Sequence, residues 1–203
     1  MNDFSPENWN VLVVGDWNPA ILTPEFISSK LLGKSPGEAV ELRVNIAFPG
    51  SYQIVQPQVL ISPSARAFEV SCATADEVAL SAAREVAAKA LDVLDRTPVR
   101  AAGFNLRYSL REGSDGFDLD ALLDEMLAPV KLSVAGRFAR RTLVWGDGTI
   151  NLDVGSPTNS PGTLALNFHR SSADPKQLAD WLRQDAEKIS EIANEIRRSL
   201  GEN

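Results

Sequence analysis

Apolar and polar residues alternate along several short stretches of this chain. The alternation is strictest over 41–48, 102–110 and 163–169, where apolar residues fill every second position. Such a period of two is typical of a strand with one face buried and the other in water. Apolar or alternating runs bounded by Pro, Gly and Ser predict further strands at 9–16, 53–62, 67–72, 137–145 and 149–154.

Apolar residues spaced three to four apart predict helices over 24–32, 76–95, 119–127 and 175–199. Their starts carry capping signals. Thr23 precedes Pro24, and Thr74 stands three residues before Glu77, the spacing of a capping box. The dipeptide Asp147-Gly148 predicts a type I′ hairpin turn, because both central residues of that turn need a positive φ.

The order strand, short helix, three strands, long helix occurs twice along the chain. It fills residues 1–97 and again residues 98–203, with little residue identity between the two halves. The pattern therefore predicts an α+β fold made of a duplicated β-α-β-β-β-α unit. We expect a mostly antiparallel, saddle-like sheet with helices packed on one face, and both units joined in one globular body. The alternative is coincidence of element order in an ordinary α+β protein.

The alternation also assigns side chains to the two faces of the sheet. The face expected to pack on the helices is apolar, with Val70, Phe104 and Leu166 among its members. The opposite face is polar and rich in asparagine, a residue that strands disfavour, which suggests a binding face. The alternative is a face that is simply solvated. The candidate binding residues are Arg43, Asn45, Asn105, Arg107, Asn151, Asn167 and His169.

This order of elements resembles, in outline, the duplicated saddle of the TATA-binding proteins, in which each half is likewise strand, helix, several strands and helix. The resemblance covers the element order only, and no motif residue can be matched. It implies that the sheet face meets a nucleic acid. The formal net charge of −7 departs from that pattern and disfavours unspecific binding to nucleic acid or to an anionic membrane.

The composition predicts a globular, cytoplasmic-type protein. Of 203 residues, 44% are hydrophobic, and no apolar run approaches the roughly 20 residues that cross a bilayer. The first residues lack the basic and apolar regions of a signal peptide. A single cysteine, Cys72, excludes an internal disulfide and a multi-cysteine metal site.

No catalytic signature stands out. His169 is the only histidine, and Cys72 is in phase with Phe68 and Val70, which predicts a buried, inert thiol. We expect no cofactor and no metal. The sequence therefore favours a non-enzymatic binding or scaffold protein that engages a protein partner, or itself, through the polar face. The alternatives are a nucleic-acid-binding protein using the same face, and an enzyme with a small-ligand pocket between the two units.

Overall fold

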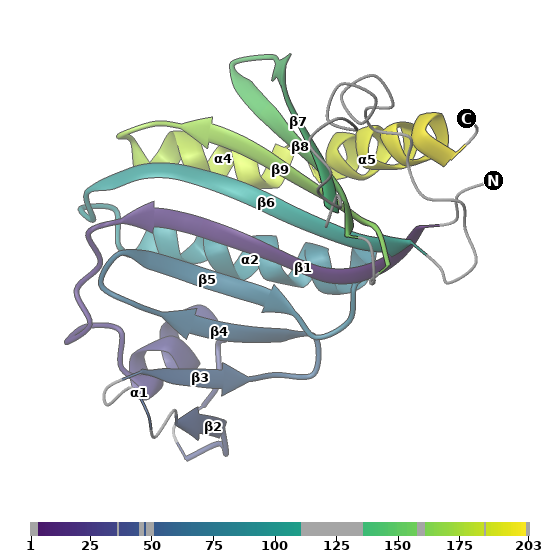
Figure 1. Cartoon of the computed structure of the whole chain (residues 1–203). Helices are drawn as coiled ribbons and strands as arrows, with labels where there is room; N and C mark the ends of the chain where they lie inside the picture. The colour runs from purple at the N-terminus through teal and green to yellow at the C-terminus, as the bar shows by residue number, and fades with distance from the viewer. Residues whose placement is uncertain are drawn as a thin grey trace, which may run out of the picture.

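The chain folds as an α+β protein. A computed structural model describes residues 4–35, 37–44, 47, 51–110, 136–157, 161–184 and 186–201. Within these residues, one nine-stranded antiparallel sheet carries four α-helices packed against it (Figure 1). None of the helices described there combines the length and the apolar character that a membrane span requires.

The first part of the chain contains β1 (Phe4–Gly15), α1 (Pro24–Phe26), the π-helix η1 (Ile27–Leu31), β2 (Glu41–Val44), β3 (Tyr52–Val55), β4 (Val59–Pro63), β5 (Ala67–Cys72) and α2 (Glu77–Val93). The second part contains β6 (Val99–Leu110), β7 (Gly136–Trp145), β8 (Gly148–Pro157), β9 (Thr163–Ser171), α4 (Pro175–Gln184) and α5 (Ala186–Gly201).

The sheet order is β2-β3-β4-β5-β1-β6-β9-β8-β7. The two longest strands, β1 and β6, lie in the middle and pair along almost their whole length. The strands of the first part therefore fill one side of the sheet and those of the second part fill the other (Figure 1).

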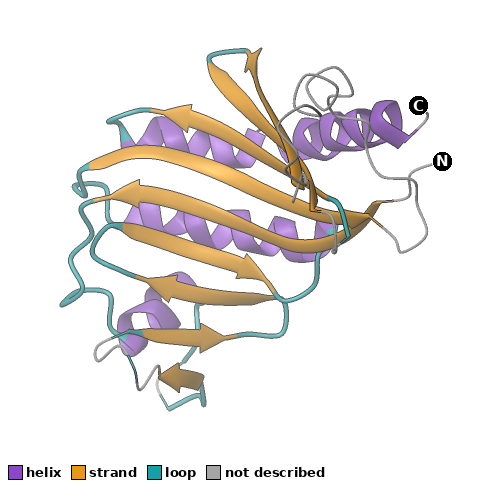
Figure 2. Cartoon of the chain, viewed as in Figure 1, coloured by secondary structure: helices purple, strands orange, loops and turns teal. Residues whose placement is uncertain are grey.

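One face of the sheet forms the core. In β1, β5, β6 and β9 the buried side chains fall mainly on alternate positions, and α2, α4 and α5 lie on the side of the sheet that these side chains face (Figure 2). Aromatic contacts pack the helix layer and the β7–β8 hairpin against this core. Trp181 of α4 packs edge-on against Phe104 at 5.5 Å between ring centroids, and Trp145 packs against Phe168 at the same separation. The opposite face has no helix over it among the described residues.

Four local predictions need correction. The stretch 53–62 forms two strands, β3 and β4, and the stretch 175–199 forms two helices, α4 and α5. The N-cap of α2 is Asp76, whose carboxylate accepts from the Ala79 amide at 2.8 Å, so Thr74 is not the cap. The turn of the β7–β8 hairpin is Gly146-Asp147, one residue earlier than predicted, because Trp145 pairs with Gly148.

The strand predicted over 41–48 is described only as Glu41–Val44, and its apolar residues are not buried. Leu42 is 42% exposed and Val44 is 61% exposed. The reason is position: β2 is the last strand at its edge of the sheet, so its side chains have a neighbouring strand on one side only. The predicted helix over 119–127 and the candidate residue Asn45 lie outside the described residues.

Candidate binding face

A row of hydrogen-bonded polar side chains crosses the uncovered face of the sheet at right angles to the strands. Asn10, Asn105, Asn167, Asn151 and Thr142 are direct neighbours in register on five adjacent strands. Asn105 donates to Asn10 and Asn167 donates to Asn105, each at 2.6 Å. Asn151 donates to Asn167 at 3.2 Å, and the Thr142 hydroxyl donates to Asn151 at 2.9 Å. We call this set, together with Glu69, the asparagine row.

All bonds of the asparagine row run in the same direction. At its far end the Asn10 amide donates to Glu69 Oε1 at 3.0 Å, and Ser71 donates to the same oxygen at 3.1 Å. An ionised carboxylate only accepts, so Asn10 must turn its amide nitrogen toward Glu69 and its oxygen toward Asn105. Each further amide of the row then has to orient in the same way, with its nitrogen toward the neighbour nearer to Glu69 and its oxygen toward the neighbour nearer to Thr142. With strands about 4.8 Å apart, the row from Glu69 to Thr142 spans roughly 24 Å.

The neighbouring positions on the same face carry balanced charge. Arg107 is exposed and lies beside Asn8 of β1 and Ala165 of β9. Asp153 of β8 is opposite Arg140 of β7, and Arg140 Nη2 donates to Asp153 Oδ2 at 2.7 Å. That hydrogen bond lowers the pKa of Asp153, so the carboxylate stays ionised beside the guanidinium. The face therefore offers both donors and acceptors with little net charge.

A hollow of about 400 Å³ lies at one end of the same face, over β2 to β5. Arg43, Gln53, Ser62 and Glu69 follow one another in it on successive strands. Gln53 donates to the Ser62 hydroxyl at 3.0 Å, and Arg43 pairs with Glu41 at 3.2 Å. Glu69 lines this hollow and also accepts the last hydrogen bond of the asparagine row, from Asn10. The row and the hollow are therefore continuous.

The structure separates the predicted site residues into three groups. Asn105, Asn151 and Asn167 touch one another in the asparagine row. Arg107 and His169 lie beside the row on the same face, and His169 Nε2 is 3.1 Å from the Ser171 hydroxyl. Arg43 is on the same face but at its edge strand, in the hollow.

The candidate list from the sequence lacked three members of the row, namely Asn10, Glu69 and Thr142, although the alternation of β5 does assign Glu69 to the polar face. Alternation could have found Asn10, because it lies between Trp9 and Val11, which are both buried. Glu69 lies in the same way between Phe68 and Val70. Thr142 had no comparable signal, because the flanking residues of the edge strand β7 are exposed.

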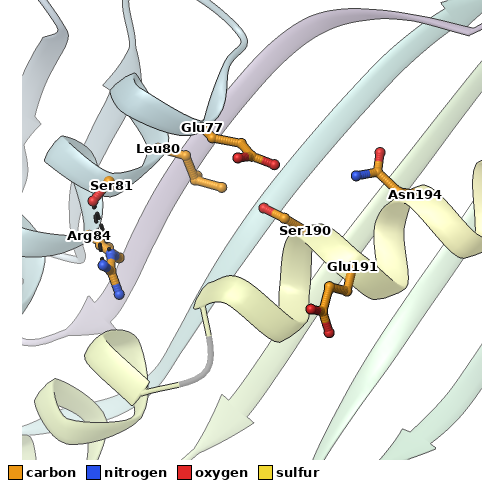
Figure 3. Close-up of a pocket in the computed structure, with 7 residues that line it drawn as sticks. All are labelled: Glu77, Leu80, Ser81, Arg84, Ser190, Glu191 and Asn194. Carbon is orange, nitrogen blue, oxygen red and sulfur yellow. Dashed lines mark hydrogen bonds between the residues drawn. The ribbon is translucent and has the colours of Figure 1, made fainter.

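A second hollow of about 400 Å³ lies on the helix side, between α2 and α5. Figure 3 shows Glu77 projecting from α2, with Ser190 and Asn194 pointing from α5 toward α2. The Arg84 guanidinium borders this groove and donates to the backbone oxygen of Arg183 at 2.6 Å. It is thus a polar groove between the two parts of the chain.

Neither a metal-binding cluster nor an activated thiol occurs among the described residues. No group of three or more His, Cys, Asp or Glu gathers among them in a way that could hold a metal ion. Cys72 is half-buried, and not fully buried as its phase predicted. This partial burial raises the pKa of the Cys72 thiol to about 12, so the thiol is protonated at neutral pH and is a poor nucleophile.

The amino-acid sequence matches no model of a known protein family and no curated protein.

Proposed function

We propose that this protein is a non-enzymatic binding or scaffold protein that engages a protein partner through the uncovered sheet face. The asparagine row carries the proposal. Each amide in the row uses part of its hydrogen-bonding capacity within the row and keeps a further N–H and a further lone pair for a partner.

Preorganisation is the physical advantage of such a face. The row side chains are held by bonds of 2.6 to 3.2 Å, so little rotamer freedom remains to be lost when a partner binds. Amides are also poor general acids, bases and nucleophiles, so a surface built from them suits recognition better than catalysis. The continuous hollow beside Glu69 adds a concave element that a partner side chain can enter.

The test uses residues beside the row, because the row itself also contributes to stability. Arg107→Glu reverses an exposed charge, and Ala165→Trp adds bulk to the face without removing a hydrogen bond of the row. Lys176→Glu, at the start of α4 on the helix side, is the charge-matched control. The immobilised chain is used to capture a partner, which is identified by mass spectrometry, purified and titrated back.

We expect the affinity of the purified partner to fall about tenfold or more for Arg107→Glu and for Ala165→Trp, and to stay within about twofold for Lys176→Glu. Urea unfolding of each variant shows whether the fold is intact. Equal binding by the wild type and both face variants contradicts the proposal.

Nucleic-acid binding across the same face is the first alternative. Arg43, Arg107, Arg140 and His169 support it, whereas the pairing of Arg140 with Asp153 and of Arg43 with Glu41 weakens the positive field. Filter binding of DNA and RNA at several salt concentrations tests it, because a phosphate-binding surface loses affinity steeply as salt rises. Absence of salt-sensitive retention excludes it.

An enzyme or binding protein with a small ligand in the α2–α5 groove is the second alternative. The groove lies between the two parts of the chain, and Glu77, Arg84 and Asn194 give it polar lining (Figure 3). A ligand bound there stabilises the folded state by mass action, so a thermal-shift screen of metabolites detects it. A screen without hits counts against this alternative.

We further propose that the two parts of the chain are copies of one β-α-β-β-β-α unit. The sheet order supports this, since each part places its first strand, β1 or β6, at the centre and its last strand, β5 or β9, directly beside it. In this arrangement β7 corresponds in position to β3, and β2 is an additional strand of the first unit. Superimposing an experimental structure of the second part on that of the first tests the duplication. Matching paths of β1, β5, β4 and β3 with β6, β9, β8 and β7 support it, and a mismatch contradicts it.

A further inference from the structure

The strand β7 ends the sheet on the side of the second part of the chain, and it is long and exposed. Its ten residues pair with β8, and the sheet order places no described strand beyond it. Phe138 is 76% exposed and Val144 is 86% exposed. The opposite edge strand, β2, has only four residues. A long edge strand with apolar side chains is a template for another extended chain.

The register of the hairpin indicates which backbone groups of β7 face outward. Trp145 and Gly148 close a two-residue turn, and such a turn is closed by a hydrogen-bonded pair. Hydrogen-bonded and non-hydrogen-bonded pairs then alternate along the ladder. The N–H and C=O groups of Phe138, Arg140, Thr142 and Val144 are therefore expected to point away from β8. In agreement, the Arg140 carbonyl accepts from the Arg141 side chain at 2.8 Å.

The asparagine row also ends at this edge. Thr142 is its last member and uses its hydroxyl hydrogen to bond Asn151. The lone pairs of that hydroxyl can accept from a donor on an added strand. A tenth strand beside β7 would thus extend both the backbone ladder and the row.

Charge indicates the chemistry of the added strand. The segment Gly136–Trp145 contains three arginines and no acidic residue, in a chain of net charge −7. Arg140 is paired with Asp153, whereas the Arg141 side chain contacts a neutral carbonyl. A second copy of this chain pairing β7 with β7 would place side by side two strands whose charged residues are all arginines, and like charges across a ladder are unfavourable. Acidic side chains on a different chain are complementary.

We propose that β7 binds an extended, acidic segment of a partner protein as an additional antiparallel or parallel strand. In this arrangement apolar side chains of the segment lie beside Phe138 and Val144 on the uncovered face, and acidic ones lie on the other face beside Arg141. The inference deepens the proposed function, on which it rests, by naming the kind of partner and the edge at which it enters.

The experiment uses the full chain and a fluorescein-labelled peptide about ten residues long with Val and Glu at alternate positions, the length and period that match β7. A peptide with Val and Lys at alternate positions, which has the same length and period but the opposite charge, is the control. Fluorescence anisotropy gives the affinity. Hydrogen exchange monitored by mass spectrometry reports whether the amides of 138–144 become protected, as a new ladder requires.

Two variants and one control separate the backbone from the charge contribution. Val144→Pro removes an outward-facing N–H and places a ring at the edge, and Val144→Thr keeps the N–H. Arg141→Glu reverses the charge. We expect the Val/Glu peptide to bind at micromolar to submillimolar concentrations. Its affinity should fall about tenfold for Val144→Pro and for Arg141→Glu, and change less than about threefold for Val144→Thr.

The outcomes distinguish this inference from the proposed function. No binding of the Val/Glu peptide up to about 1 mM, or equal binding by Val144→Pro and Val144→Thr, overturns strand addition at β7. Concentration-dependent dimerisation that Val144→Pro abolishes would assign the edge to a second copy of the chain and overturn the proposal of an acidic partner. Tighter binding of an oligonucleotide than of the Val/Glu peptide would overturn it as well. If a captured partner is lost by Arg107→Glu but retained by Val144→Pro, the inference fails while the proposed function stands.

Discussion

Removing the middle of the asparagine row should destabilise the fold by a predictable amount. Asn167 donates to Asn105 at 2.6 Å and accepts from Asn151 at 3.2 Å, so Asn167→Ala deletes two hydrogen bonds and leaves a group unpaired on each neighbour. A net contribution of about 0.5–1.5 kcal/mol per bond gives an upper estimate of about 3 kcal/mol. These side chains are only part-buried, so water replaces some of what is lost, and we expect about 1–2 kcal/mol.

The assay is urea unfolding followed by circular dichroism. With an m value of about 2 kcal/mol/M, the midpoint should fall by about 0.5–1 M without a change in m. Arg107→Ala, on the same face but outside the row, is the control and should alter the free energy of unfolding by less than about 0.5 kcal/mol.

A double-mutant cycle isolates the bond between Asn105 and Asn167. The double alanine variant removes that bond once and not twice, so the coupling energy should be about 1 kcal/mol. The reasoning is refuted if Asn167→Ala is no more destabilising than Arg107→Ala, or if the two alanine substitutions add without coupling. The first result would mean that Asn167 adds no net stability through the row, and the second that its bond to Asn105 contributes no coupling energy.

Three further outcomes follow from the described contacts. Gly148→Ala should cost about 1–3 kcal/mol in urea unfolding, because a Cβ there would lie 2.6 Å from the backbone oxygen of His169 and force β8 and β9 apart; an unchanged midpoint contradicts that close approach. Cys72, whose pKa burial raises to about 12, should react with iodoacetamide at pH 8 far more slowly in the folded than in the urea-unfolded protein, and equal rates are inconsistent with it. Burial also raises the pKa of Tyr108 to about 12, so its contribution to stability is complete below the ordinary tyrosine pKa of about 10 and is lost as the pH rises through 12; Tyr52 has the same raised pKa, so Tyr108→Phe should reduce the alkaline loss in thermal unfolding without abolishing it, and a loss of unchanged size in Tyr108→Phe would argue against Tyr108 as one of its sources.

The sequence alone indicated much of this architecture, because local periodicity survives in long elements with one buried face. The alternation of Phe104, Leu106 and Tyr108 placed these residues in the core, where they are at most 1% exposed. It equally placed Asn105 and Asn167 on the opposite face. The prediction of burial was wrong where the local pattern does not show which strand lies beside a given strand in the sheet. Leu42 and Val44 alternate as core residues do, yet they are exposed, since nothing in their spacing shows that β2 ends the sheet.

Only the tertiary structure decided which polar residues form a site. Asn10 and Asn105 are 95 positions apart, and Asn105 and Asn167 are 62 positions apart, so their contacts depend on the sheet order and register. The direction of the hydrogen bonds likewise depends on Glu69, which only strand pairing brings beside Asn10. The sequence determined which face each side chain occupies, because the side-chain period is local. The fold decided which of these side chains meet, because strand neighbours in a sheet are set by long-range packing.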